Sequence, residues 1–243
     1  MSPTQNRKIK NMKIFVVRIG NKYGPEYEDY IESKLGDDYE VVWIREPYDN
    51  RVELQWNKMS VMDMDIDEPV CVIDIDLLLI NDYKKCFDFP VERGQFLAMR
   101  AWWRDTLHPD YSLNGGFYKY YPNDCRYIYE KFMTDVEHWQ KFYIRAGITS
   151  GPVNGEQYFV EDAVKEELEL IYLPSAWQTR WLSQNDVLPD LYTEWQNRFN
   201  KKYEAVTGNE YAWFGDFHED IKLVHFTHEM NLPHTWKYYK QYT

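Results

Sequence analysis

The first third of the chain alternates between short apolar runs and stretches in which apolar residues recur at helical spacing. The apolar runs lie at 13–19, 39–44 and 69–73, and the helical stretches between them at 25–35 and 52–64. Pro25 at the start of the first helical stretch and Gly36 directly after it are typical of helix boundaries. An order of strand, helix, strand, helix and strand predicts a parallel, Rossmann-like sheet over residues 12–81.

The remaining residues, 82–243, carry a less regular pattern. Strands are predicted at 96–102, 116–121, 170–173 and 221–226, and helices at 123–145, 156–168 and 190–205. We find neither an internal repeat nor a linker long enough to separate two domains. The pattern predicts one α/β domain over 12–243. Residues 1–11 are basic, lack the apolar core of a signal peptide and are expected to form a flexible leader.

Composition and charge narrow the possible classes of protein. The net charge of −12 argues against a general nucleic-acid binder, which needs a basic face. No apolar stretch approaches the roughly 20 residues of a membrane span, so we expect no membrane insertion. The 3 cysteines show no C-x-x-C spacing, which fits a reducing compartment such as the cytoplasm, and Cys71 is expected to be buried. An acidic protein that binds a polyanion needs a local device, such as a divalent cation.

Two aspartates follow the third apolar run. Asp74 and Asp76 are two residues apart, so on a strand both carboxylates point to the same side. Two oxygen ligands in that geometry suit Mg²⁺ or Mn²⁺ with a bound diphosphate. The same letters occur in phosphatases of the haloacid dehalogenase type, where the first aspartate is the nucleophile. That alternative is less favoured, because those enzymes carry the motif in their first strand and Leu77 and Leu78 follow it here.

Three further elements contain polar residues of possible function. In "LNGGFY" (113–118), two glycines let the backbone approach a ligand and Asn114 can bond to hydroxyls, although a plain turn would look the same. In "GEQYF" (155–159), Glu156 opens a helix, where a carboxylate also complements the helix dipole. In "VHF" (224–226), His225 ends a strand, and such a histidine is more often structural than a ligand.

The order of these elements resembles the GT-A glycosyltransferases, particularly glycogenin and the related galactosyltransferases. The matching motifs are "IDID", "LNGGFY", "GEQYF" and "VHF", and the likeness spans residues 13–228. "WNKM" and "AWWRD" are closest in wording to the small glycosyltransferases of large chlorella viruses. The resemblance implies a mixed central sheet flanked by helices, with a nucleotide-binding half over 12–81 and a sugar and acceptor half over 82–243. It also implies sugar transfer from a UDP-sugar to a glycan hydroxyl, with rhamnosyl or glucosyl transfer in viral glycan synthesis in the host cytoplasm as a narrower expectation.

The resemblance assigns roles to individual residues. Asp76 and His225 would coordinate Mn²⁺ (or Mg²⁺) with the donor's diphosphate, and Asp74 would contact the ribose and assist the metal. Lys58 would reach a phosphate or a sugar hydroxyl, unless it is an ordinary solvated lysine. The full set implied to bind the donor is Val17, Arg18, Ile19, Gly20, Lys58, Asp74, Ile75, Asp76, Asn114, Gly115 and His225.

Two catalytic routes stay open. An inverting enzyme needs a carboxylate as general base on the acceptor hydroxyl, and Glu156 is the first candidate, followed by Asp105 and Asp162. In a retaining enzyme, Gln157 would support an oxocarbenium-like state on one face of the sugar. The viral likeness favours inversion. Glu156 is also a departure from the family, which usually has aspartate at this position.

The C-terminal motif departs further from the family. The ending "HFTHEMNLPHTW" lacks the family's diphosphate-binding lysine, and His228, His234 or Lys237 are the candidates to replace it. Tryptophan pairs are abundant, and we expect exposed rings to form the acceptor side, although a core position is the ordinary explanation for a tryptophan. These rings are Trp102, Trp103, Trp177 and Trp181.

Two other functions compete with sugar transfer. A sugar nucleotidyltransferase would need a glycine-rich, basic loop after the first strand, and "RIGNKYGPEYED" is a faint version of one. A non-catalytic carbohydrate-binding module would explain the aromatic residues, but it leaves Asp74 and Asp76 without a role. The chain is also compatible with one part of a larger glycosylation protein.

Overall fold

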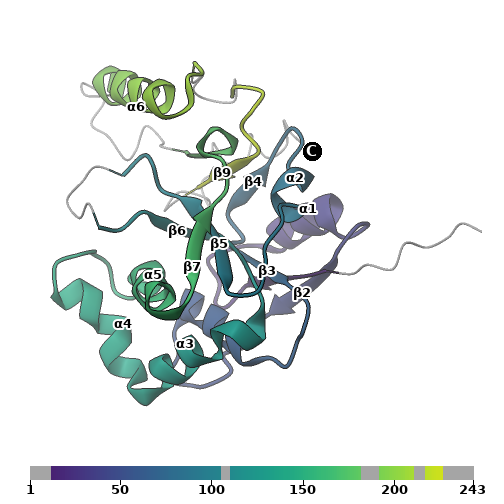
Figure 1. Ribbon diagram of the computed structural model, residues 1–243, viewed down its shortest axis with the longest axis vertical. Coiled ribbons are helices and arrows are strands. Elements are labelled where there is room, and N and C mark those ends of the chain that lie inside the picture. The colour runs from purple at the N-terminus through teal and green to yellow at the C-terminus, as the bar shows by residue number, and fades with distance from the viewer. Residues whose placement is uncertain (1–11, 105–109, 182–191, 211–216, 227–243) are drawn as a thin grey trace, which may run out of the picture.

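A computed structural model describes residues 12–104, 110–181, 192–210 and 217–226 of the chain (Figure 1). Its centre is a six-stranded sheet with the order β2-β1-β3-β6-β5-β7. The strands are β1 (Lys13–Val17), β2 (Glu40–Ile44), β3 (Val70–Ile73), β5 (Gln95–Arg100), β6 (Leu113–Tyr120) and β7 (Glu169–Tyr172). β1 runs parallel to β2 and β3, whereas β6 is antiparallel to both of its neighbours. The expected mixed central sheet is therefore confirmed.

A second, three-stranded sheet lies beside the central one and has the order β4-β9-β8. Its strands are β4 (Leu77–Leu79), β8 (Gln178–Arg180) and β9 (Leu223–His225). The sequence pattern predicted β9 but neither β4 nor β8. Both are only three residues long, and they pair with β9, which is far from them in the sequence.

Helices cover both faces of the central sheet. The helices of the described residues are α1 (Pro25–Leu35), the 3-10 helix η1 (Leu54–Asp63), α2 (Lys84–Phe87), α3 (Pro122–Thr134), α4 (Val136–Arg145), α5 (Glu156–Glu167), the 3-10 helix η2 (Ser175–Trp177) and α6 (Tyr192–Thr207), of which α6 lies apart from the central sheet (Figure 1). The prediction of a single helix over 123–145 is wrong in one respect. It breaks at Asp135, whose side chain accepts a hydrogen bond from the backbone N–H of His138 and so begins α4.

The central strands send alternate side chains into two cores, as the two-residue period of a strand requires. Ile14, Cys71 and Phe117 pack on the face covered by α1 and α2. Phe15, Val72 and Tyr118 pack on the opposite face, against η1, α3, α4 and α5 (Figure 1). Cys71 is buried with a free thiol, as predicted.

The tryptophans that we expected to be exposed are mostly part of the core. Trp102, Trp103 and Trp181 are buried, and Trp177 is partly buried. The Trp102 indole N–H donates to the carbonyl of Gln178 at 2.7 Å, and the Trp181 ring stacks on Phe226. The prediction of exposed rings at these positions is wrong, because the rings pack against other aromatic side chains. Trp102 contacts Trp103 as well as Phe199 and Tyr203 of α6. In the part of the chain that the structure describes, no helix has both the length and the apolar character to span a bilayer.

Candidate active site

The predicted polar residues meet where β3, β6 and β9 come together. Asp74 directly follows β3, and its backbone N–H donates to the carbonyl of Gly116 on β6 at 2.9 Å. Asp76 stands just before β4, and its carbonyl accepts from the N–H of Phe226 at 3.0 Å. His225 ends β9, opposite Leu77 of β4. Backbone pairing therefore brings together side chains that are about 150 positions apart in the sequence.

Asp74, Asp76 and His225 form a cluster that can hold a cation. One donor atom from each residue lies within 4.8 Å of the others. His225 Nε2 is 3.5 Å from Asp74 Oδ2 and 3.4 Å from Asp76 Oδ1. Two carboxylates and an imidazole form a ligand set that suits Mn²⁺, so the residues fit the predicted metal. A divalent ion held there would supply a Lewis acid toward phosphate oxygens.

Neighbouring groups orient the members of this cluster. The amide nitrogen of Asn114 lies 3.2 Å from His225 Nδ1, while its carbonyl oxygen accepts from the N–H of Gly116 at 2.9 Å. The hydroxyl of Tyr23 donates to Asp76 Oδ2 at 3.1 Å. Hydrogen bonds of this kind fix the ring and carboxylate orientations on which metal sites depend.

The cluster is also electrostatically balanced. Burial disfavours the imidazolium of His225, but the Asp76 and Asp74 carboxylates outweigh it and raise the pKa of His225 to about 9. Burial likewise disfavours ionised Asp74, yet Lys58 and His225 lower the pKa of Asp74 to about 2. Without a metal ion, Asp74 is therefore negative and His225 positive at neutral pH, and a bound metal ion would displace the His225 proton.

Lys58 connects this cluster to the other wall of the site. It lies on η1, is only 1% exposed, and places Nζ 2.5 Å from Asp74 Oδ1. Nζ also donates to the carbonyl of Gly115 at 2.7 Å and lies 3.8 Å from Glu156 Oε2. A buried lysine needs such partners because an unpaired charge in the interior costs several kcal/mol. The alternative of a solvated lysine is thus excluded.

Glu156 is the first residue of α5 and is 4% exposed. Burial, reinforced by the Asp74 charge and opposed by Lys58, raises the pKa of Glu156 to about 7. The hydroxyl of Tyr118 donates to Glu156 Oε1 at 3.1 Å and orients the carboxyl. A carboxyl with a pKa near the working pH is suited to accepting and returning a proton.

Gly115 allows this wall to close. A Cβ at position 115 would lie 3.0 Å from Glu156 Oε2 and 3.1 Å from the Tyr118 hydroxyl, so a larger residue would displace the carboxyl. The N–H of Gly115 donates to Gln157 Oε1 at 3.1 Å. The pairing of β5 with β6 shifts its register between Ala98 and Met99, so that Ala98 pairs with Tyr118 but Met99 pairs with Asn114.

A cavity of about 560 Å³ lies over these residues. Eleven of the predicted site residues line it, namely Val17, Ile19, Lys58, Asp74, Ile75, Asp76, Asn114, Gly115, Glu156, Gln157 and His225. Trp103, the one tryptophan of the expected acceptor side found there, also lines it.

Other predicted residues lie elsewhere. The Arg18 guanidinium pairs with Glu28 and donates to the carbonyl of Tyr23, and neither Arg18 nor Gly20 is among the lining residues. Asp162 accepts hydrogen bonds from the Tyr111 and Tyr143 hydroxyls and is not a lining residue either. Asp105, His228, His234 and Lys237 fall outside the described residues.

Several lining residues were not predicted from the sequence. They include Lys22, Tyr23, Gln55, Arg104, Asn154, Tyr158 and Arg180. Arg180 lies on β8 in register with His225 on β9. Some of them stand in the motifs quoted above, as Arg104 does in "AWWRD" and Tyr158 in "GEQYF", but no role followed from those positions. They come from helices, strands and loops that only the tertiary structure brings to the cavity.

Comparison with known proteins supports the fold. No family model matches the chain, and no curated protein matches it in sequence. Among solved structures, it is similar to the galactosyltransferase LgtC in complex with donor and acceptor sugar analogues, with a TM-score of 0.52, 9% identity, and coverage of 96% of each chain. It is also similar to the glycosyltransferase GlyE of Streptococcus pneumoniae TIGR4, with a TM-score of 0.55 and 10% identity, covering 94% of this chain and 60% of GlyE. The chain therefore has the predicted GT-A fold.

Proposed function

We propose that the chain is a metal-dependent glycosyltransferase that moves a sugar from a UDP-sugar to a hydroxyl of a glycan acceptor. One observation carries the proposal. A carboxylate and imidazole cluster suited to Mn²⁺ (or Mg²⁺) and a buried carboxyl with a pKa of about 7 line the same cavity. The cluster suits a donor diphosphate, and the buried carboxyl suits proton transfer at the acceptor.

The donor would lie across the cavity from the first strand to α5. Val17, Ile19 and Ile75 offer an apolar edge for the nucleoside, next to the metal cluster. Asp74, Asp76 and His225 would hold the metal ion, and a bound ion would supply positive charge toward the donor's diphosphate. Asn114, Gly115 and Gln157 lie beyond the cluster and present amide groups that can bond to sugar hydroxyls.

We assign the role of general base to Glu156. An acceptor hydroxyl within hydrogen-bonding distance of Glu156 would give up its proton to the carboxylate as its oxygen attacks the anomeric carbon, and the configuration would invert. Lys58 favours the ionised base, because it lowers the pKa that burial raises. The alternative is retention supported by Gln157, whose carbonyl oxygen already accepts the N–H of Gly115.

The likeness in wording to the chlorella-virus enzymes extends this proposal to rhamnosyl or glucosyl transfer in viral glycan synthesis in the host cytoplasm. The buried free thiols of Cys71, Cys86 and Cys125 are compatible with a reducing compartment. A carbohydrate-binding module remains the competing function. It predicts sugar binding that is independent of both metal and nucleotide.

Donor hydrolysis tests the proposal. The protein is incubated with a panel of UDP- and GDP-sugars with and without Mn²⁺, and the released nucleotide is measured. We expect slow, Mn²⁺-dependent release from one UDP-sugar that Asp76→Ala abolishes. Asp82→Ala is the matched control, because Asp82 is an exposed aspartate paired with Lys85 shortly after β4. NMR of the sugar product then separates inversion from retention.

Thermal melting provides the second arm. UDP and Mn²⁺ together should stabilise the protein more than the sum of their separate effects, and a site filled at about 100 times Kd adds roughly 2.7 kcal/mol. No nucleotide release from any donor, together with additive melting shifts, would contradict sugar transfer and favour the binding module.

A further inference from the structure

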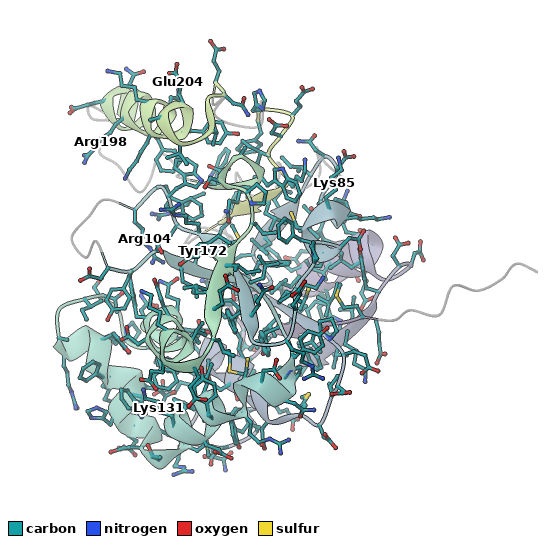
Figure 2. All side chains as sticks on the ribbon, viewed as in Figure 1. Lys85, Arg104, Lys131, Tyr172, Arg198 and Glu204 are labelled. Atoms are coloured by element: carbon teal, nitrogen blue, oxygen red, sulfur yellow. The ribbon has the colours of Figure 1, made fainter. Side chains whose placement is uncertain are left out.

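Arg104 lines the same cavity, and the chemistry proposed above does not use it. It follows β5 in the segment that leads toward β6 (Figure 2). Its Nη1 donates to the carbonyl of Leu113 at 2.9 Å, and its guanidinium lies 5.2 Å from the centre of the Tyr158 ring. These two contacts hold the guanidinium plane in one orientation at the cavity wall.

The positive charge of Arg104 has no acidic partner among the residues that the structure describes. No described carboxylate lies within 4.0 Å of it, in contrast to Arg18 and Arg93, which form ion pairs. The nearby Glu161 is already bound by the N–H groups of Ser112 and Leu113 and by Lys165. Burial lowers the pKa of Arg104, and the opposing charge of Glu161 is too weak to offset the lost hydration.

The contacts of Arg104 also place it within the cavity. Leu113 immediately precedes Asn114, and Tyr158 immediately follows Gln157. Both neighbours therefore adjoin the residues that we assign to the sugar, rather than the cluster that we assign to the metal. Arginine presents its N–H donors as a planar fork that matches the two oxygens of a carboxylate or the oxygens of a phosphate.

We propose that Arg104 binds an anionic substituent, a carboxylate or a phosphate, on a sugar at this end of the cavity. This inference rests on the proposed function and narrows it to charged substrates. The anion can come from the donor, as in a nucleotide-linked uronic acid, or from the acceptor. Either source would supply the counter-charge that the described part of the chain does not supply.

Calorimetric binding distinguishes the two sources. In the donor arm, UDP-glucuronate and UDP-glucose are titrated into the protein with Mn²⁺. In the acceptor arm, methyl glucuronide, glucose 6-phosphate and methyl glucoside are titrated into the protein saturated with UDP and Mn²⁺. We expect one arm to show a preference of about tenfold or more for the anionic ligand, the size of a charge-assisted hydrogen-bonded pair.

Variants link this preference to the guanidinium. Arg104→Met should abolish the preference and leave binding of UDP with Mn²⁺ unchanged. Arg104→Lys keeps the charge but not the fork and should retain part of the preference. Arg100→Met is the matched control, because Arg100 also lies near a tyrosine ring, that of Tyr172 at 5.9 Å, but does not line the cavity. Melting midpoints check that each variant is folded.

The possible failures are separable. If UDP with Mn²⁺ does not bind to the unmodified protein, the proposed function is overturned. If UDP with Mn²⁺ binds but neither arm prefers the anionic ligand, the inference about Arg104 is overturned alone. The inference about Arg104 is also overturned if the preference survives in Arg104→Met. The same holds if Arg104→Lys and Arg100→Met reduce the preference as much as Arg104→Met does.

Discussion

Glu161 provides a quantitative test of how the site is held in place. This α5 residue is fully buried, and its carboxylate accepts the N–H of Ser112 at 3.0 Å and the N–H of Leu113 at 2.8 Å. Lys165, one turn further along α5, lies 2.9 Å away. Leu113 begins β6 and directly precedes Asn114. The carboxylate therefore fixes the start of β6 against the helix that carries Glu156.

Two substitutions separate the contributions. Glu161→Leu keeps much of the side-chain volume but leaves two N–H groups without an acceptor, at about 1–3 kcal/mol each, so we expect a loss of about 2–6 kcal/mol of unfolding free energy. Glu161→Gln keeps one carbonyl oxygen that can accept from both N–H groups. It loses the extra strength that charge gives to these bonds and the ion pair with Lys165, so we expect a smaller loss of about 1–2 kcal/mol.

The assay is urea unfolding, with binding of UDP and Mn²⁺ as a second readout. Glu166→Leu is the control, because Glu166 is on the same helix, half-exposed, and paired with Lys131 at the surface. Such exposed pairs contribute only about 0–1 kcal/mol. If Glu161→Leu costs no more than Glu166→Leu, or if Glu161→Gln costs as much as Glu161→Leu, the reasoning is refuted.

Three further perturbations test the site itself. The folded pKa of Glu156, about 7, lies above its ordinary value of 4.5, so unfolding free energy should fall as pH rises from 4.5 to 7, by on the order of 3 kcal/mol. Urea titrations of Glu156→Gln should show that fall reduced, and an unchanged pH profile would contradict the assignment. Lys58→Met leaves Asp74 without its buried partner and should cost about 3–5 kcal/mol in the same assay, and a loss below 1 kcal/mol would show that the pair is not coupled. A Cβ in Gly116→Ala would lie 2.8 Å from Asn114 Oδ1 and displace the amide that orients His225, so Mn²⁺ affinity measured by calorimetry should fall about 10–100-fold, and unchanged affinity would argue against this orientation of His225 as a ligand.

The strand-end positions of the site were predictable because they follow from backbone periodicity. A carboxylate pair two residues apart after a buried strand must project to one side, and the structure places Asp74 and Asp76 within reach of His225. The bounds of α1 were likewise readable from Pro25 and Gly36, and the structure has α1 over Pro25–Leu35. Local sequence rules were therefore sufficient to predict α1 and the position of the two aspartates.

Other features depend on contacts between distant segments and were not predictable. β4 and β8 are strands only because β9 pairs with them. Trp102 packs against α6 and Trp181 against Phe226, a role that their clustering in the sequence does not reveal. Arg104 joins the cavity through its contacts with Leu113 and Tyr158, which no spacing rule connects to it.

Lys58 explains how an acidic protein can gather three carboxylates in one cavity. Asp74, Asp76 and Glu156 would repel one another if each were ionised without a counter-charge. The Lys58 ammonium lies 2.5 Å from Asp74 and 3.8 Å from Glu156, and it donates to the carbonyl of Gly115 between them. It therefore keeps Asp74 ionised, lowers the pKa of Glu156 toward neutrality and fixes the glycine backbone. One buried cation thus couples the proposed metal cluster to the proposed base, so a change at Lys58 should alter metal affinity and the pH dependence of turnover together.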